Sequence, residues 1–103
     1  MKLQIEEANM QKISILGMTL DEWTYKSCLA HVATGSGWAT LYDIRSKEEG
    51  KGHATYLLQA MKRCYESQGL DFGGSIALND RMRKLYLKCG IKEYTQILVG
   101  YKE

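Results

Sequence analysis

Residues 49–58 read EGKGHATYLL, and this stretch decides the fold because it joins a strand-like segment, residues 38–45, to a helical apolar pattern. The first amides of a helix lack partners within it and carry a positive partial charge. Gly50 and Gly52 would let a phosphate approach those amides closely. The stretch predicts a cradle for a phosphate or pyrophosphate, although a flexible turn whose glycines relieve backbone strain would have the same sequence.

Two common nucleotide-binding loops do not fit this stretch. A Walker loop requires Gly-Lys followed by Ser or Thr, and here Gly52 is followed by His53. A dinucleotide fingerprint requires a third glycine, and Thr55 stands in its place. The loop alone therefore does not identify the ligand.

A second stretch, residues 79–91, reads NDRMRKLYLKCGI and follows an apolar run at residues 72–78. Together the two stretches resemble the GNAT superfamily of N-acetyltransferases, and the resemblance covers residues 38–94. The first motif of that family is Gln/Arg-x-x-Gly-x-Gly/Ala between a strand and a helix. Residues 49–54 match it, except that Glu49 stands where Gln or Arg is usual.

The second family motif is an Asn after the next strand, a helix that contains a Tyr, and a closing Gly-Phe. This chain has Asn79, Tyr86 and Gly90 at the matching positions. Ile91 stands where Phe is usual and keeps the apolar anchor. Glu49 places a negative charge near the expected pyrophosphate, so the backbone geometry supports phosphate binding better than the side chains do.

The resemblance implies one α/β domain of the α+β kind over residues 1–103, with a mixed, mostly antiparallel GNAT-like sheet flanked by helices. Its central strands, residues 38–45 and 72–78, would splay apart so that the coenzyme fits between them. The helices that usually precede these strands and wall the acceptor pocket are reduced here. We therefore expect an open acceptor site, which suits a protein or another large acceptor.

The resemblance also implies acetyl-coenzyme A as the cosubstrate. The loop would hold its pyrophosphate through backbone amides at the helix start. The loop residues assigned to the cosubstrate are Glu49, Gly50, Lys51, Gly52, His53 and Ala54. Lys51 adds positive charge, and His53 is expected to offer its amide rather than its imidazole.

Further cosubstrate contacts are expected from the strand and from the second motif. Exposed backbone of Leu41, Tyr42 and Ile44 would pair with the pantetheine arm as an added strand would, and one N–H there would polarise the thioester carbonyl. Asn79 would hydrogen-bond the pantetheine, and the same residue can cap the helix. Lys84 would meet the 3′-phosphate.

A role without any ligand explains the basic residues around Lys84 equally well. Arg81 and Arg83 belong to the same cluster, and a solvated helix face explains all three.

Acetyl transfer requires a proton acceptor and a proton donor. A lysine-like amine has a pKa of about 10.4 and must lose a proton before it attacks, and the departing thiolate benefits from a donor. Tyr86 matches the family position of that donor, and a core aromatic residue is its alternative. Asp43 is the candidate base, and a solvated strand carboxylate is its alternative. His31 is expected at the strand surface, and Cys89 is expected to pack rather than to act as a nucleophile.

Apolar periodicity predicts the elements in chain order. Residues 38–45 alternate, with Leu41 and Asp43 on one face and Tyr42 and Ile44 on the other, and both faces are expected to be covered. The other predicted elements are strands at 2–7, 11–18, 25–34, 72–78 and 94–101, helices at 54–68 and 80–89, turns at 8–9 and 34–37, and a short helical turn at 19–23.

Composition narrows the function classes. The chain has 103 residues, 45% of them hydrophobic and 25% charged, as expected for a globular domain. A net charge of +2 is too mild to indicate nucleic acid, and no apolar run is long enough to span a membrane. The N-terminus is too polar for a secretory signal, and three cysteines without metal-ligand spacing indicate reduced thiols in a cytoplasmic protein.

We therefore expect an N-acetyltransferase that moves acetyl from acetyl-coenzyme A directly to a primary amine, such as a protein lysine or an N-terminus, and that uses no metal. One alternative is a catalytically degenerate acyl-coenzyme A-binding regulatory or interaction module. Another is a binding domain whose glycines are coincidental. A homodimer is plausible because edge strands are open to pairing.

Overall fold

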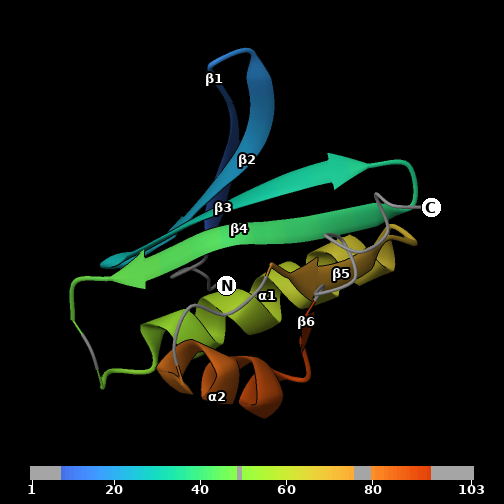
Figure 1. Cartoon of the computed structure of the whole chain (residues 1–103). Coiled ribbons are helices and arrows are strands. Elements are labelled where there is room, and N and C mark those ends of the chain that lie inside the picture. Colours follow the sequence, from blue (N-terminus) through green and yellow to red (C-terminus); the bar gives the residue numbers. More distant parts are fainter. Residues whose placement is uncertain (1–7, 49, 76–79, 94–103) are drawn as a thin grey trace, which may run out of the picture.

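The computed structural model describes residues 8–48, 50–75 and 80–93, which form six strands and two helices around one core (Figure 1). In chain order the elements are β1 (Asn9–Ile15), β2 (Met18–Tyr25), β3 (Cys28–Gly35), β4 (Trp38–Ser46), α1 (His53–Ser67), β5 (Asp71–Gly74), α2 (Asp80–Cys89) and β6 (Lys92–Glu93). The strands form one sheet in the order β1-β2-β3-β4-β5-β6.

The sheet is mixed and mostly antiparallel. The strands β1 to β4 are antiparallel neighbours, whereas β5 pairs in parallel with both β4 and β6. Parallel neighbours need a crossover, which α1 supplies between β4 and β5 and α2 supplies between β5 and β6. The expected mixed α+β class, with a mostly antiparallel sheet flanked by helices, is confirmed.

Several predicted elements agree with the structure within a few residues. The strand at 38–45 is β4, and the helices at 54–68 and 80–89 are α1 and α2. The strand expected at 72–78 begins with β5, and residues 76–78 lie outside the described part of the chain. The strands expected at 2–7 and 94–101 also lie outside it.

The N-terminal hairpin differs from the prediction. The strand predicted at residues 11–18 contains the hairpin turn, because β1 ends and β2 begins within it. Leu16 and Gly17 form this turn with φ angles of +50° and +82°. The turn predicted at 8–9 is wrong at Asn9, which already belongs to β1. Leucine rarely adopts a positive φ, so Leu16 gives no turn signal in the sequence. The apolar pattern of the predicted strand therefore continues through the turn without a break.

The helical turn predicted at residues 19–23 is also wrong, because these residues belong to β2. Thr19 and Glu22 have capping-box spacing, but strand pairing on both sides outweighs that local signal. Trp23 adds to the strand preference, since its side chain is buried in the core. The strand predicted at 25–34 starts later, as β3, because a turn intervenes.

A β-bulge interrupts the pairing of β3 with β4. Leu41 lies opposite Val32, but the next matched pair is His31 with Asp43. Tyr42 is therefore an extra residue on β4. A bulge adds one residue to one strand and shifts every later side chain to the other face.

Because of the bulge, the residues after Tyr42 lie on the opposite faces of β4 from those predicted. Strict alternation places Asp43 with Leu41 and places Ile44 opposite to them. In the structure Ile44 packs on the same core as Leu41, and Asp43 shares the other face with its partner His31.

The two faces of the sheet are covered unequally. Within the described residues both helices lie on one side of the sheet, which we call the helix face (Figure 1). The expectation that β4 is covered on both sides is wrong, since Trp38 is 43% exposed and Tyr42 is 49% exposed. The opposite side is called the outer face.

The core lies between the sheet and α1. Its helical contribution follows the predicted apolar stripe, with Leu57, Leu58, Met61 and Tyr65 buried. Each fully buried aliphatic side chain of this kind contributes about 1.5–3 kcal/mol to stability. The helix α2 packs on α1 and β6 and adds Tyr86 and Cys89 to the same core.

A buried polar cluster fixes α1 to β2. The Tyr65 hydroxyl donates a hydrogen bond of 2.6 Å to Oδ2 of Asp21 and accepts one of 2.8 Å from Nε1 of Trp23. Lys12 reaches Oδ1 of Asp21 at 2.6 Å. Burial, with the Asp21 carboxylate beside it, raises the pKa of Tyr65, so the hydroxyl keeps its proton and the cluster remains fully paired.

The cysteines behave as packing residues. Cys28 and Cys89 are buried, Cys64 is partly buried, and all three are free thiols. Burial raises the pKa of Cys28 to about 11 and also raises that of Cys89, which keeps both thiols protonated at neutral pH. Within the described residues, neither helix has the length and apolarity that a bilayer-crossing segment requires.

Candidate functional site

A groove with a volume of about 840 Å³ lies where the end of β4, the following loop, the start of α1 and one side of α2 meet. We call it the basic groove, because five of its lining side chains are cationic and one is acidic. The cationic residues are Arg45, Lys51, Arg81, Lys84 and Lys88, and the acidic residue is Glu48; the other lining residues are Ile44, Ser46, Gly50, Gly52, Ala54, Thr55, Met82 and Leu85. A groove of this charge favours an anionic ligand.

The loop geometry explains why glycines stand at the start of α1. Gly50 and Gly52 have φ angles of +80° and +79°, a region that other residues avoid. Gly52 is the N-cap of α1, where no side chain caps the helix and no acidic residue occupies the first turn. Among the described residues, the first helical amides therefore have no side-chain cap, and the first turn carries no acidic residue to offset the positive end of the helix dipole.

The basic groove brings together about half of the predicted cosubstrate residues. Ile44, Gly50, Lys51, Gly52, Ala54 and Lys84 line it. Glu49 and Asn79 lie outside the described residues. Leu41, Tyr42 and His53 are not among the residues that line the groove.

The three basic residues predicted together on α2 separate in the structure. Arg81 and Lys84 line the basic groove. Arg83 instead reaches Glu93 of β6 at 3.4 Å and Asp80 at 3.9 Å. The hydrogen bond to Glu93 raises the pKa of Arg83, which stays charged.

His53 is held by the turn between β2 and β3. Its Nδ1 lies 3.1 Å from the Ser27 hydroxyl, and its ring meets the Tyr25 ring edge-on with centroids 5.8 Å apart. Tyr25 also stacks on Tyr56 of α1 at 4.2 Å. These contacts fix the first turn of α1 and leave the imidazole directed at the protein.

The backbone predicted to pair with pantetheine is only partly open. Parallel pairing of β4 with β5 runs to Leu41 opposite Gly74, and the Leu41 carbonyl also accepts the Ser75 amide at 2.9 Å. The Ser75 hydroxyl donates to the Tyr42 carbonyl at 3.3 Å. Among the described residues, no β4–β5 pair continues beyond Leu41. The Leu41 carbonyl therefore accepts a hydrogen bond within the protein and is not free to pair with pantetheine, whereas Ile44 lines the groove.

Tyr86 reaches the point where this pairing ends. Its side chain is 2% exposed, and its hydroxyl donates a hydrogen bond of 3.1 Å to the Ser75 carbonyl. The ring lies where a side chain on Gly74 would be, so the glycine makes room for it. Burial raises the pKa of Tyr86, which keeps the proton that a donor must supply.

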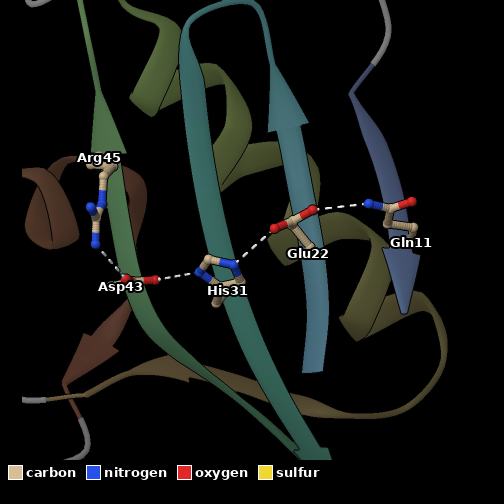
Figure 2. A network of polar contacts seen from close by, with 5 residues as sticks. All are labelled: Gln11, Glu22, His31, Asp43 and Arg45. Carbon is tan, nitrogen blue, oxygen red and sulfur yellow. Dashed lines mark hydrogen bonds and ion pairs between the residues drawn. The ribbon is translucent and has the colours of Figure 1, made fainter. Parts of the chain in front are cut away.

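Asp43 lies on the outer face and belongs to a chain of polar contacts across four strands (Figure 2). His31 bridges two carboxylates, with Nδ1 2.9 Å from Asp43 and Nε2 3.1 Å from Glu22. Gln11 donates to the far oxygen of Glu22 at 2.9 Å, and Arg45 donates to the far oxygen of Asp43 at 3.2 Å. The sequence pointed to Asp43 and left His31 as a surface residue.

The charge state of His31 follows from these partners. Burial of the ring, the largest single influence, lowers its pKa, but hydrogen bonds and charge attraction from Asp43 and Glu22 together raise it above the ordinary value. The hydrogen bond from Gln11, followed by that from His31, lowers the pKa of Glu22. A doubly protonated ring satisfies both carboxylates, because each ring nitrogen then donates. Glu22, His31 and Asp43 lie on three successive strands, and only the register reveals that His31 meets both carboxylates.

Comparison of the chain with protein-family models, with curated proteins and with solved structures finds no match in any of the three.

Proposed function

We propose that this protein is a GNAT-like N-acetyltransferase that moves an acetyl group from acetyl-coenzyme A directly to a primary amine on a protein or another large acceptor. The observation that carries the proposal is the basic groove at the uncapped start of α1. Coenzyme A presents a pyrophosphate and a 3′-phosphate, and four cationic side chains beside the helix amides, Lys51, Arg81, Lys84 and Lys88, match that charge, whereas Arg45 pairs with Asp43. The buried, protonated thiols suit the cytoplasmic location that we propose with it.

The groove also lies beside a suitable strand. Where the described pairing of β4 with β5 ends, β4 continues to Ser46, and Ile44 and Arg45 line the groove. An amide-bearing pantetheine arm pairs with exposed strand backbone in the way an added strand does. That arrangement would bring the thioester toward the Tyr86 hydroxyl, whose proton would go to the departing sulfur.

The first test measures whether the phosphates of coenzyme A are recognised. We expect acetyl-coenzyme A to raise the melting temperature and to bind at least tenfold more tightly than acetyl-pantetheine, which lacks the nucleotide. Changing Arg81 and Lys84 together to Ala should remove most of that difference. Arg63→Ala is the matched control, because Arg63 is exposed on α1 and does not line the groove.

Equal affinity for the two compounds, measured by isothermal titration calorimetry, would overturn the proposal. So would an Arg63→Ala variant that loses as much affinity as the double variant.

A degenerate acyl-coenzyme A-binding module is the second candidate. Two observations favour it: the Tyr86 hydroxyl is engaged by the Ser75 carbonyl, and Asp43 lies on the outer face, away from the groove. Tyr86→Phe separates the candidates, since it keeps the ring and removes the proton. For the enzyme we expect kcat to fall at least tenfold with acetyl-coenzyme A affinity unchanged. Wild-type protein that binds acetyl-coenzyme A but acetylates no amine in a broad panel would favour the degenerate module.

A further inference from the structure

The turn between β1 and β2 exposes contiguous apolar surface. Ile15, Leu16, Gly17 and Met18 follow one another there, and we call these four residues the hairpin tip. Leu16 is 99% exposed, and Ile15 and Met18 are each 43% exposed. Leu16 also has a φ of +50°, a conformation that leucine rarely adopts. A large apolar side chain that is both strained and fully in solvent indicates a surface that a partner covers.

The hairpin tip stands away from the rest of the sheet. The described pairing of β2 with β3 begins at Asp21, so residues 18–20 of β2 extend beyond it. Figure 1 shows this end of the hairpin projecting away from β3 and β4. The tip is therefore placed to reach a neighbouring molecule without any change in the sheet.

A hollow of about 480 Å³ lies on the outer face, where the hairpin leaves the sheet, and we call it the outer hollow. Its lining residues are Ile15 and Leu20 from the hairpin, His31, Tyr42 and Asp43 from β3 and the bulged part of β4, and Ser75. Neither described helix covers this face (Figure 1). Ile15, Leu20 and Tyr42 give the outer hollow an apolar wall.

The charged residues of the outer hollow are already paired within the chain (Figure 2). One oxygen of Asp43 lies 2.9 Å from Nδ1 of His31, and the other accepts a hydrogen bond from Arg45 at 3.2 Å. Nε2 of His31 lies 3.1 Å from Glu22, whose second oxygen accepts a hydrogen bond from Gln11. Because these contacts use the charges of this face internally, the outer hollow favours an uncharged, apolar occupant.

The charge of the hairpin favours a protein partner over a lipid surface. Residues 9–25 contain one cation, Lys12, and two carboxylates, Asp21 and Glu22. Lys12 pairs with Asp21 at 2.6 Å. An anionic lipid surface attracts lysine and arginine, and this hairpin has no excess of them. The apolar tip is therefore matched to an apolar protein surface, and the outer hollow of this same chain is such a surface.

We propose that two copies of this chain form a symmetric dimer in which Leu16 of each copy enters the outer hollow of the other. Ile15 lines the outer hollow and directly precedes Leu16, so the tip and the hollow of one copy lie close together. A twofold axis beside them makes the same contact twice and covers both tips. Leu16 of one copy packs against Leu20 and Tyr42 of the other.

This dimer is independent of the acetyltransferase function proposed above. The outer hollow and the basic groove have no lining residue in common, so the groove of each copy stays open in the dimer. Failure of one proposal therefore leaves the other standing.

Sedimentation equilibrium of the full chain is the first test. We expect a weak, reversible dimer whose share rises between about 10 μM and 1 mM, as for a small interface. Leu16→Asn should weaken the dimer at least tenfold, because it removes the apolar side chain and keeps the turn. Leu87→Asn is the matched control, since Leu87 is 77% exposed on α2, and it should leave the dimer unchanged. A wild-type chain that stays monomeric at about 1 mM, or equal losses in the two variants, would overturn the proposal.

A mixing experiment tests whether the contact is reciprocal. Tyr42→Glu places a charge in the outer hollow at a side chain that is 49% exposed, so the fold should be kept. In a mixture with Leu16→Asn, the Tyr42→Glu copy still offers its Leu16 to an intact hollow. The two variants should therefore associate with each other at least threefold more tightly than either does with itself. No such gain would contradict the exchange of tips.

Isotope-filtered NMR on a mixture of labelled and unlabelled chain locates the contact. We expect intermolecular NOEs between the Leu16 methyl groups and the Tyr42 ring. Intermolecular NOEs that join β1 to β1 instead would place the contact at the sheet edge and would overturn the proposal. A monomeric wild-type chain that binds phosphatidylcholine vesicles, with Leu16→Asn failing to bind, would also overturn it, because the hairpin tip would then contact lipid.

Discussion

Asp21 and Glu22 are neighbours on β2, yet their carboxylates lie on opposite faces of the sheet and have different surroundings. Asp21 faces the helices, is 3% exposed, and is paired with Tyr65 and Lys12. Glu22 faces outward, and its side chain is 22% exposed beside His31. The contact between Asp21 and Tyr65 holds α1 on the sheet. Glu22 instead contacts His31, a residue whose charge changes with pH.

The comparison teaches that two carboxylates adjacent in sequence can differ in partners and exposure, and that sequence alone does not reveal the difference. Burial raises the pKa of Tyr65, so its hydroxyl keeps its proton near neutral pH and its hydrogen bond to Asp21 is maintained. His31 changes charge in that range, and its contacts with Glu22 and Asp43 change with it. The helix face should therefore respond most to changes in packing, and the outer face to pH and ligands.

The largest effect is expected on the helix face from Gly74→Ala. A Cβ at Gly74 would overlap the buried ring of Tyr86, so the free energy of unfolding should fall by about 1–3 kcal/mol in a urea titration. Adding Tyr86→Leu should restore part of the loss by making space. A Gly74→Ala variant as stable as the wild type would contradict the packing of Tyr86 against β5.

A smaller loss of stability is expected from Tyr65→Phe. The ring stays, but Asp21 and the Trp23 indole lose a buried partner, so stability should fall by about 1–2 kcal/mol. Tyr56→Phe is the matched control on the same helix and should change stability by less than about 0.5 kcal/mol, because its ring stacking on Tyr25 is kept. Equal effects in the two variants, measured by thermal or urea unfolding, would argue against the polar cluster.

A pH-dependent effect is expected on the outer face. The pKa of His31 is raised in the folded state, so its stabilisation is complete below the ordinary value of 6.5 and is lost as pH rises through the raised value. His31→Gln should therefore cost more stability at pH 5.5 than at pH 9. Urea midpoints of both proteins across that range provide the check, and parallel curves would show that the two carboxylates do not hold a charged ring.

The smallest effect is expected at the hairpin that contributes to the outer hollow. Leu16 is 99% exposed and has a φ of +50°, a conformation that asparagine adopts more readily than leucine. Leu16→Asn should raise the free energy of unfolding by a few tenths of a kcal/mol to about 1 kcal/mol. Lys26→Asn, at the next turn with a φ of +54°, should act in the same direction. A loss of stability in both variants would contradict these turn conformations.

Sequence patterns predicted the half of the fold that depends on helices. The apolar stripe of α1, the glycines at both of its ends and the short α2 all follow from local periodicity and helix-end chemistry. The hairpin turn at Leu16 was missed because an apolar residue occupies a position that usually needs Asn or Gly. Pairing across β1 to β3 then overrode the helical signal at Thr19 and Glu22.

The candidate site was predictable where it depends on the loop, and not where it depends on register. Gly50, Gly52 and Lys84, which the family resemblance assigns to the cosubstrate, line one groove, and their contact with a cosubstrate stays a prediction. The bulge at Tyr42 has no sequence signal, because the alternation of β4 continues through it. That one extra residue moved Asp43 to the outer face and brought it to His31, which no linear pattern indicates.

The long connection between β4 and β5 has a consequence for the order of folding. The pairs among β1 to β4 join segments that are adjacent in sequence, whereas β5 meets β4 only after α1 has crossed between them. Closing that longer loop costs entropy before any contact compensates for it, so the meander should form first and β5 should dock late. We therefore expect the Gly74 amide to exchange with deuterium sooner than the central amides of β3. The contact between the Tyr86 ring and Gly74 should be the first part of the core to open.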